Sequence, residues 1–256
     1  MQDQNAGYVK SERHGHMMYI EFFHPQSNSL PRSLLTGLAN QINEAGLDAE
    51  IRVIVLRSPG EKAFCAGASF KELSEIKNSR EGEEFFNGFA FVINSMRKCP
   101  KFIIARIQGK CVGGGVGIAA AADYAIAITG ADIKLSELDI GIGPFVVGPA
   151  VERKLGLSAY SQLAIDAASW RTAEWAKTRG LYAEVHANIQ EVDDALQRLV
   201  NRLSHSSQQA VKEIKKVLWH DTGHWDQLLA ERAKISGYLI TTEAAQNAIQ
   251  LIRSKT

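Results

Sequence analysis

Three consecutive glycines, Gly113 to Gly115, carry the clearest chemical signal in the chain. The β-branched run at residues 102–107 predicts a strand before them, and the alanines after them predict a helix that begins near Gly114. At the start of a helix, glycines carry no Cβ and leave backbone N–H groups without partners at the positive end of the helix dipole. The pattern predicts a site for an anion or a developing oxyanion. A tight turn that lets the helix pack on the strand is the structural alternative.

Glu137 is a second candidate, because it lies in a loop, residues 136–144, that glycines and a proline make irregular and exposed. The neighbouring side chains of Leu138 and Ile140 are apolar, so partial desolvation would raise the pKa of its carboxyl group toward neutrality. That pKa suits a base that must also return the proton it takes. Asp139 is the nearest substitute for this role. A surface glutamate in a turn is the structural alternative.

Other reactive residue types give weaker signals. The cysteines Cys65, Cys99 and Cys111 are odd in number and lack C-x-x-C spacing, which predicts reduced, buried thiols and neither a disulfide nor a zinc site. No histidine stands near them in sequence to activate a nucleophilic thiol. His220 and His224 have the spacing of a metal-binding pair, but no third ligand is evident, which favours a helix end or the surface.

Composition and charge limit the classes of function. The chain has 256 residues, of which 45% are hydrophobic, so one sizeable core can form without disulfides or metals. A net charge of +1 without a long basic run argues against nucleic acid as a partner. Nucleotide binding is not predicted, because Ile118 replaces the third glycine of G-x-G-x-x-G and no P-loop occurs. The polar residues 1–10 and the lack of a long apolar run predict a cytoplasmic protein without a membrane span.

The elements that would position these residues alternate between strand and helix. Strands are expected at residues 16–23, 51–56, 102–107, 124–128, 133–135 and 182–185. Helices are expected from residues 31 and 114, and at residues 70–76, 81–99, 147–155, 158–167, 172–179, 192–203, 208–218, 225–239 and 243–252. This order predicts an α/β protein, with Ser29 as the cap of the first helix and Phe85, Phe86 and Phe89 in the core or a subunit interface.

A second small-residue loop and a carboxylate loop complete a pattern that resembles the crotonase superfamily, the enoyl-CoA hydratases and isomerases. The resemblance rests on residues 62–73 (KAFCAGASFKEL), residues 109–123 (GKCVGGGVGIAAAAD) and the Ser136-Glu137 pair followed by Gly141 and Pro144, and it covers nearly the whole chain. It implies a spiral of β-β-α repeats that forms two nearly perpendicular sheets.

The resemblance also implies an assembly. Residues 1–190 would form the acyl-CoA-binding and catalytic domain, and residues 191–256 a helical region that mediates trimerisation, giving a homotrimer or a hexamer of two trimers. The apolar contact surface is expected from Trp225, Leu228, Leu229 and Tyr238.

Roles for individual residues follow from the same resemblance. Substrates would be acyl-CoA thioesters, and no cofactor is implied beyond their CoA moiety. The backbone N–H groups of Ala68 and Gly114 would form an oxyanion hole that stabilises a thioester enolate, and Glu137 would be the acid/base. Further positions that match substrate or CoA contacts are Gln26, Ser27, Asn28, Lys62, Ala66, Lys71, Leu73, Gly113, Gly117 and Pro144.

Three positions depart from the family's pattern. Hydratases carry a second glutamate at the position of Gly117, which has no side chain. Because one base suffices to move a proton from C2 to C4 of an enoyl group, this favours an isomerase over a hydratase. Ser69 replaces the usual acidic residue of its loop, and Phe145 stands where dienoyl-CoA isomerases carry an aspartate. An acyl-CoA decarboxylase, a thioesterase and a non-catalytic acyl-CoA-binding protein are the alternatives.

Overall fold

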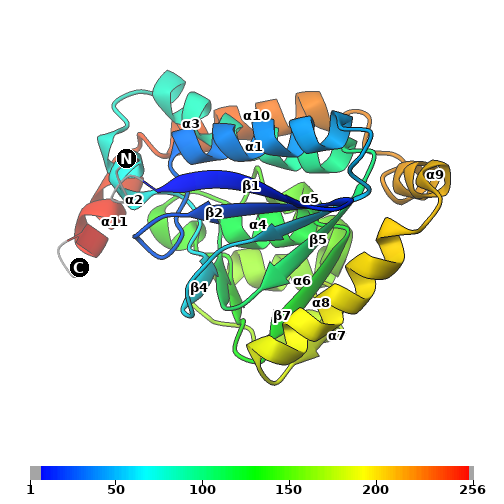
Figure 1. The fold of residues 1–256 in the computed structure, drawn as a ribbon. Helices are drawn as coiled ribbons and strands as arrows, with labels where there is room; N and C mark the ends of the chain where they lie inside the picture. The colour runs from blue at the N-terminus through cyan, green and yellow to red at the C-terminus, as the bar shows by residue number, and fades with distance from the viewer. Residues whose placement is uncertain (1–6, 254–256) are drawn as a thin grey trace.

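A computed structural model describes residues 7–253, which form two sheets surrounded by helices (Figure 1). The larger sheet holds, side by side, β1 (Tyr8–His14), β2 (Met17–Phe23), β3 (Val53–Arg57), β5 (Phe102–Ile107), β7 (Tyr124–Ile128) and β9 (Glu184–His186). The smaller sheet holds β4 (Ala63–Cys65), β6 (Lys110–Val112) and β8 (Ile133–Lys134). Apart from the antiparallel hairpin of β1 and β2, adjacent strands in both sheets are parallel.

The chain spirals between the two sheets. β3, β5 and β7 belong to the larger sheet, and the strand that follows each of them, β4, β6 or β8, belongs to the smaller one. A helical segment then leads back to the next strand of the larger sheet. This repeated β-β-α unit confirms the predicted α/β class and the spiral architecture.

Helices cover both faces of the larger sheet. They are α1 (Arg32–Leu47), α2 (Phe70–Glu75), α3 (Ser79–Lys98), α4 (Gly114–Ala121), α5 (Gly148–Leu155), α6 (Leu157–Ile165), α7 (Ala173–Thr178), α8 (Ile189–Ser204), α9 (Gln208–Leu218), α10 (Trp225–Leu239) and α11 (Glu243–Arg253), with a 3₁₀ turn, η1, at Leu138–Ile140. α1, α3 and α10 lie together as one layer, and α8 packs on the other face of the sheet (Figure 1). No helix within residues 7–253 is long and apolar enough to cross a membrane.

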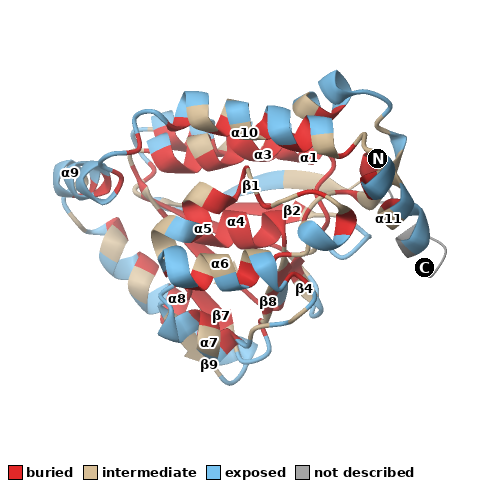
Figure 2. Ribbon diagram, turned by 180° about the vertical axis from the view of Figure 1, so that it is seen from behind, coloured by how far each residue is buried: buried red, intermediate tan, exposed pale blue. Residues whose placement is uncertain are grey.

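Side chains alternate along each strand, so the two faces of the larger sheet enter different apolar clusters. Ile54 and Leu56 belong to the main core, which includes residues of α1 and α3, whereas Val53 and Val55 belong to a smaller cluster under α8. α4 is apolar on all sides and is buried along its whole length (Figure 2). The glycine turn that begins α4 is therefore held rigidly inside the protein.

The C-terminal region packs on the body of the same chain. α10 runs along α3, and α11 contacts both α2 and η1. The main core therefore runs across residue 190, the predicted domain boundary, and includes Trp225 and Leu229. The expectation that these two side chains supply subunit contacts is wrong, because they are only 6% and 0% exposed within the chain, whereas Tyr238 is 63% exposed.

Most elements lie within a few residues of their predicted bounds, and four features were not predicted correctly. β1, β4 and β6 were not expected, because β1 is an edge strand exposed over most of its length and β4 and β6 have only three residues each, so none shows a clear periodicity. Ser29 does not cap α1: the N-cap position is Pro31, and the Arg32 amide donates instead to Glu72 Oε2 at 2.8 Å. The three cysteines are free and buried, as predicted.

Candidate active site

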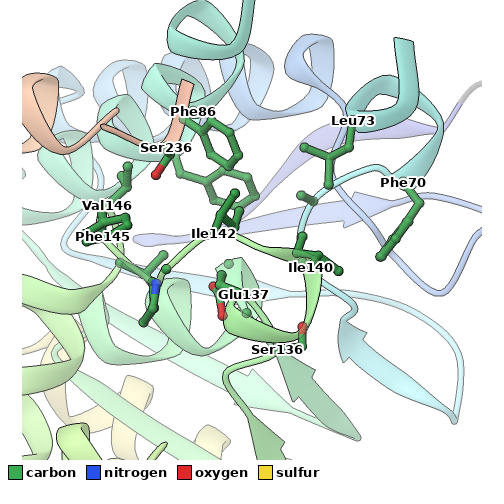
Figure 3. A pocket seen from close by; sticks show the side chains of 18 of the residues that line it. Phe70, Leu73, Phe86, Ser136, Glu137, Ile140, Ile142, Phe145, Val146 and Ser236 are labelled. Atoms are coloured by element: carbon green, nitrogen blue, oxygen red, sulfur yellow. The ribbon is translucent and has the colours of Figure 1, made fainter. Parts of the chain in front are cut away.

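One pocket brings together the glycine turn of α4, the loop before α2 and the loop that contains Glu137 (Figure 3). It is lined by Ala66, Gly67, Ala68, Phe70, Leu73, Phe86, Phe89, Gly113, Gly114, Ser136, Glu137, Ile140, Ile142, Gly143, Pro144, Phe145, Val146, Val147 and Ser236. Most of these side chains are apolar. Glu137 is the one carboxylic acid among these described residues, and no lysine, arginine or histidine accompanies it.

The two small-residue loops meet at Gly67 and Gly114. Gly67 has φ +85°, and a Cβ there would lie 2.8 Å from the Val112 carbonyl oxygen and 3.3 Å from the Gly114 nitrogen. Only glycine allows this approach, which places the amide of the next residue, Ala68, beside the start of α4. Among the described residues, the amides of Ala68 and Gly114 have no hydrogen-bond partner. The pocket therefore presents two unpaired N–H donors, one of them at a helix N-terminus.

Each glycine of the turn is required by a different neighbour. A Cβ on Gly113 would lie 3.0 Å from Glu137 Oε1, and one on Gly114 would lie 2.2 Å from the ring of Phe89. A Cβ on Gly115 would lie 2.4 Å from the Cys65 carbonyl oxygen. These contacts bear out the packing explanation of this stretch, and the anion site stays a prediction that the two unpaired amides favour.

Glu137 is half-buried, and only Leu138 and Asp139 of the loop that was predicted to be exposed are so, because the loop packs over the pocket. Its Oε2 is buried and has no hydrogen-bond partner among the described residues. Burial raises the pKa of this carboxyl group to about 7. Asp139, the substitute base, forms an ion pair with Lys134 at 3.2 Å and does not line the pocket. Glu137 is therefore the one carboxyl group of the described pocket lining that a bound molecule would meet.

Gly117 does not line the pocket, because Val147 lies between them. A Cβ at residue 117 would lie 2.4 Å from Val147 Cγ1 and 2.6 Å from Val147 Cβ. Val147 is itself a lining residue. The space that a second carboxylate would need is thus occupied by a hydrocarbon side chain.

The residues predicted to contact CoA fall into separate groups. Ala66, Leu73, Gly113 and Pro144 line the pocket, while Gln26 and Lys71 line a neighbouring groove together with Ser69. The exposed Lys62 side chain lies in neither cavity.

Asn28 and Ser27 have structural contacts. The buried Asn28 amide donates to the carbonyl oxygens of Pro59 and Ala63, at 3.0 and 2.9 Å, and the Ser27 carbonyl accepts from the Ala66 amide at 3.2 Å. These hydrogen bonds hold the loop that carries Ala66 in position.

Several lining residues were not predicted as part of the site. The helical spacing of Phe86 and Phe89 predicts a place in the core or in a subunit interface, and such spacing does not distinguish either from a pocket wall. Val147 and Ser236 gave no signal at all, because only the folding of distant segments brings them to the glycine turn. Ser69 caps α2, where its Oγ accepts from the Glu72 amide at 3.4 Å.

The family model for enoyl-CoA hydratase/isomerase matches residues 12–251 of this chain. The chain belongs to this family. As a member of the crotonase superfamily, it is 32% identical to human mitochondrial methylglutaconyl-CoA hydratase over 175 residues, which cover 68% of this chain and 51% of that protein. It is 26% identical to a probable enoyl-CoA hydratase of Bacillus subtilis over 238 residues, 92% of each protein.

The family fold is seen in solved structures. The crystal structure of enoyl-CoA hydratase from Bacillus halodurans matches with a TM-score of 0.86 at 22% identity, over 95% of this chain and 99% of that one. The aligned part of the chain spans about half the length of several curated relatives, 51% to 55% of each. Together with the family model, these matches establish the family and the fold of this chain.

Proposed function

We propose that this protein is an enoyl-CoA isomerase that moves a double bond by a one-base mechanism. The observation that carries the proposal is the replacement of a second acid/base group by hydrocarbon. Val147 fills the space beside Gly117, and Glu137 is the only titratable side chain among the described lining residues. A reaction in which one group removes a proton and returns it needs only the single acid/base group that the described lining provides.

The unpaired amides supply the other requirement of the reaction. Removal of a proton from C2 of a 3-enoyl thioester moves negative charge onto the thioester oxygen. The N–H groups of Ala68 and Gly114 would donate to that oxygen, and preorganised donors of this kind typically contribute about 10²–10³ in rate each. Glu137, then protonated, would return the proton at C4 and yield the 2-enoyl thioester. No atom is added or lost.

The CoA moiety would extend from the pocket toward the groove lined by Gln26 and Lys71. Ala66 and Leu73 line the pocket itself, and Ser69, two residues before Lys71, lines the groove. A lysine there would attract the CoA phosphates as a point charge. No cofactor other than the CoA of the substrate is proposed.

Hydration is the second candidate function, because relatives carry the names probable enoyl-CoA hydratase and short-chain-enoyl-CoA hydratase. Hydration must hold and activate a water molecule in addition to protonating C2. With Glu137 as the only acid/base in the lining, both tasks would fall on one carboxyl group, which makes this reaction the less favoured of the two.

A panel of thioesters tests the proposal. Incubation with 3-enoyl-CoA should give 2-enoyl-CoA of unchanged mass by mass spectrometry, with kcat/KM rising with pH through about 7 as Glu137 ionises. Addition of water to 2-enoyl-CoA, release of carbon dioxide from malonyl-type thioesters or release of free CoA would identify a hydratase, a decarboxylase or a thioesterase. Binding without conversion would identify a non-catalytic protein.

Glu137→Gln is the matched variant, because it keeps size and hydrogen bonding but not proton exchange. Turnover should fall by about 10²–10⁴ with acyl-CoA affinity nearly unchanged. Asp139→Asn, two residues away and outside the pocket, is the control and should keep the wild-type rate. Full isomerase activity in Glu137→Gln would contradict the proposed mechanism.

A further inference from the structure

Among the described residues, Ser236 is the polar side chain that the C-terminal helices contribute to the pocket. It belongs to α10, far in sequence from the loops that form the catalytic end, yet it lines the same cavity. The only other polar side chains of the described lining are Ser136 and Glu137, which are adjacent in sequence. In Figure 3, Ser236 lies beside Phe86, at the opposite end of the pocket from Ser136.

The Ser236 side chain lies in the wall of the pocket and is almost wholly covered by the rest of the chain. The residue is 1% exposed, and its hydroxyl group makes no hydrogen bond with another described residue, although it is not one of the fully enclosed unpaired atoms of the structure. Many serines and threonines in helices bond to a carbonyl of the preceding turn, as Thr178 does with the Glu174 carbonyl at 2.9 Å. A hydroxyl group in a mostly apolar cavity wall, without a partner from the protein, is available for a hydrogen bond with an atom of a ligand that enters the cavity.

Two glycines bring Ser236 to this position. A Cβ on Gly82 would lie 2.7 Å from Gly237 Cα, and a Cβ on Gly237 would lie 2.4 Å from the Glu83 nitrogen. α3 and α10 therefore lie in backbone contact at these two glycines, and Ser236, the residue before Gly237, lies beside Phe86 of α3 (Figure 3). The position of the hydroxyl is fixed by helix packing and not by a loop.

We propose that Ser236 is a specificity residue that forms a hydrogen bond with an oxygen substituent near the distal end of the acyl chain. The thioester end of the substrate would lie at the amides of Ala68 and Gly114, and the chain would cross the apolar wall of Phe86, Ile142 and Val146. A hydroxyl or carbonyl oxygen at the far end would then meet Ser236. The preferred substrates are oxygenated acyl-CoAs, and plain hydrocarbon chains would leave the hydroxyl unpaired.

The test compares matched pairs of non-reacting ligands and rests on the proposed acyl-CoA function. Saturated acyl-CoAs of increasing length, and the same chains with a terminal hydroxyl group, are titrated into the full-length protein by calorimetry. At the length that reaches Ser236, the hydroxylated ligand should bind about 10-fold to 100-fold more tightly than its unsubstituted partner. Ser236→Ala should remove this preference, and Ser136→Ala, the same change at the other end of the pocket, should keep it.

The outcomes separate the two proposals. Tight binding of unsubstituted acyl-CoAs with no preference for hydroxylated chains at any length would overturn the role of Ser236 and leave the proposed function intact. A preference that survives in Ser236→Ala would overturn it as well. Absence of binding by every acyl-CoA would overturn both the role of Ser236 and the proposed function.

Discussion

Burial determines the pKa of the Glu137 carboxyl group, because no positively charged side chain lines the pocket among the described residues. Desolvation is the main cause of its raised pKa, and a backbone hydrogen bond lowers the pKa by less. The sequence predicted this direction from the apolar neighbours of Glu137. It could not predict the lack of a partner for Oε2, which depends on residues from four distant segments.

The raised pKa makes stability depend on pH. In the unfolded chain the carboxyl group ionises near its usual 4.5, whereas in the folded protein it stays neutral up to about 7. Its contribution to stability is therefore fully present below pH 4.5 and is lost as pH rises through about 7. Glu137→Gln should remove this loss and be more stable than the wild type above neutral pH, by on the order of 3 kcal/mol.

Urea unfolding at acidic and mildly alkaline pH measures this effect. The wild type should become less stable relative to Glu137→Gln as the pH rises, while Asp139→Asn, which changes a half-exposed paired carboxylate, should follow the wild type. A constant difference between wild type and Glu137→Gln at all pH values would show that the carboxyl group is not desolvated.

Val147 determines what a carboxylate at residue 117 can do. In Gly117→Glu alone, the new Cβ meets Val147 Cγ1 at 2.4 Å, so we expect a loss of about 1–3 kcal/mol in stability and no gain of hydration. In Gly117→Glu combined with Val147→Gly, the space is free, and hydration of 2-enoyl-CoA should appear. Val147→Gly is the control, and loss of the absorbance of the conjugated thioester is the readout. Equal hydration by Gly117→Glu alone would refute the steric explanation.

At the scale of elements, local signals predicted most helices and strands. α9 and α10 have the predicted bounds. The start of α4 at Gly114 was also predictable, because glycine and alanine influence the backbone conformation of their immediate neighbours. The N-cap of α1 was missed because its first amide is paired with Glu72, 40 residues away. The same difference between local and long-range contacts applies to the site. Its glycine loops were predictable, whereas the walls that α3 and α10 contribute were not.

The close backbone contact between α3 and α10 can be tested by substitution of a glycine. Gly237→Ala inserts a methyl group 2.4 Å from the Glu83 nitrogen and must push α10 outward, so unfolding should require about 1–3 kcal/mol less free energy. The control is Gly223→Ala, because nothing lies within 4 Å of its new methyl group. Urea unfolding compares the two variants. Equal stability of both would mean that the helices separate without cost.

At the scale of the whole molecule, the spiral fold was predictable from the resemblance of three short segments to a known family, and not from hydrophobic periodicity. Periodicity could not show that the last quarter of the chain packs on the catalytic body. One anchor is Asp123, whose Oδ2 lies 2.6 Å from Lys215 Nζ and whose Oδ1 accepts from Trp219 Nε1 at 3.0 Å. Such pairs between α9 and the start of β7 are long-range contacts that only the folded chain reveals.

α9 also presents an exposed apolar surface, in addition to Ile235 and Tyr238 of α10, which are 42% and 63% exposed. Ile214, Val217 and Leu218 are 49%, 68% and 45% exposed, on a helix whose other face is buried through Val211. A cluster of exposed apolar side chains on one helix is typical of a contact between proteins. We therefore expect a trimer or hexamer in solution that uses α9, in place of the surface predicted on Trp225 and Leu229.

Light scattering tests this assembly at micromolar protein concentration. The wild type should have three or six times the mass of one chain, and Ile214→Asp combined with Val217→Asp should shift the mass toward the monomer, because burying two carboxylates in an apolar contact is unfavourable. Leu157→Asp is the control, since Leu157 is 65% exposed and belongs to α6 and not to α9. A wild-type monomer would exclude the assembly, and an unchanged oligomer in the double variant would exclude α9 as its contact surface.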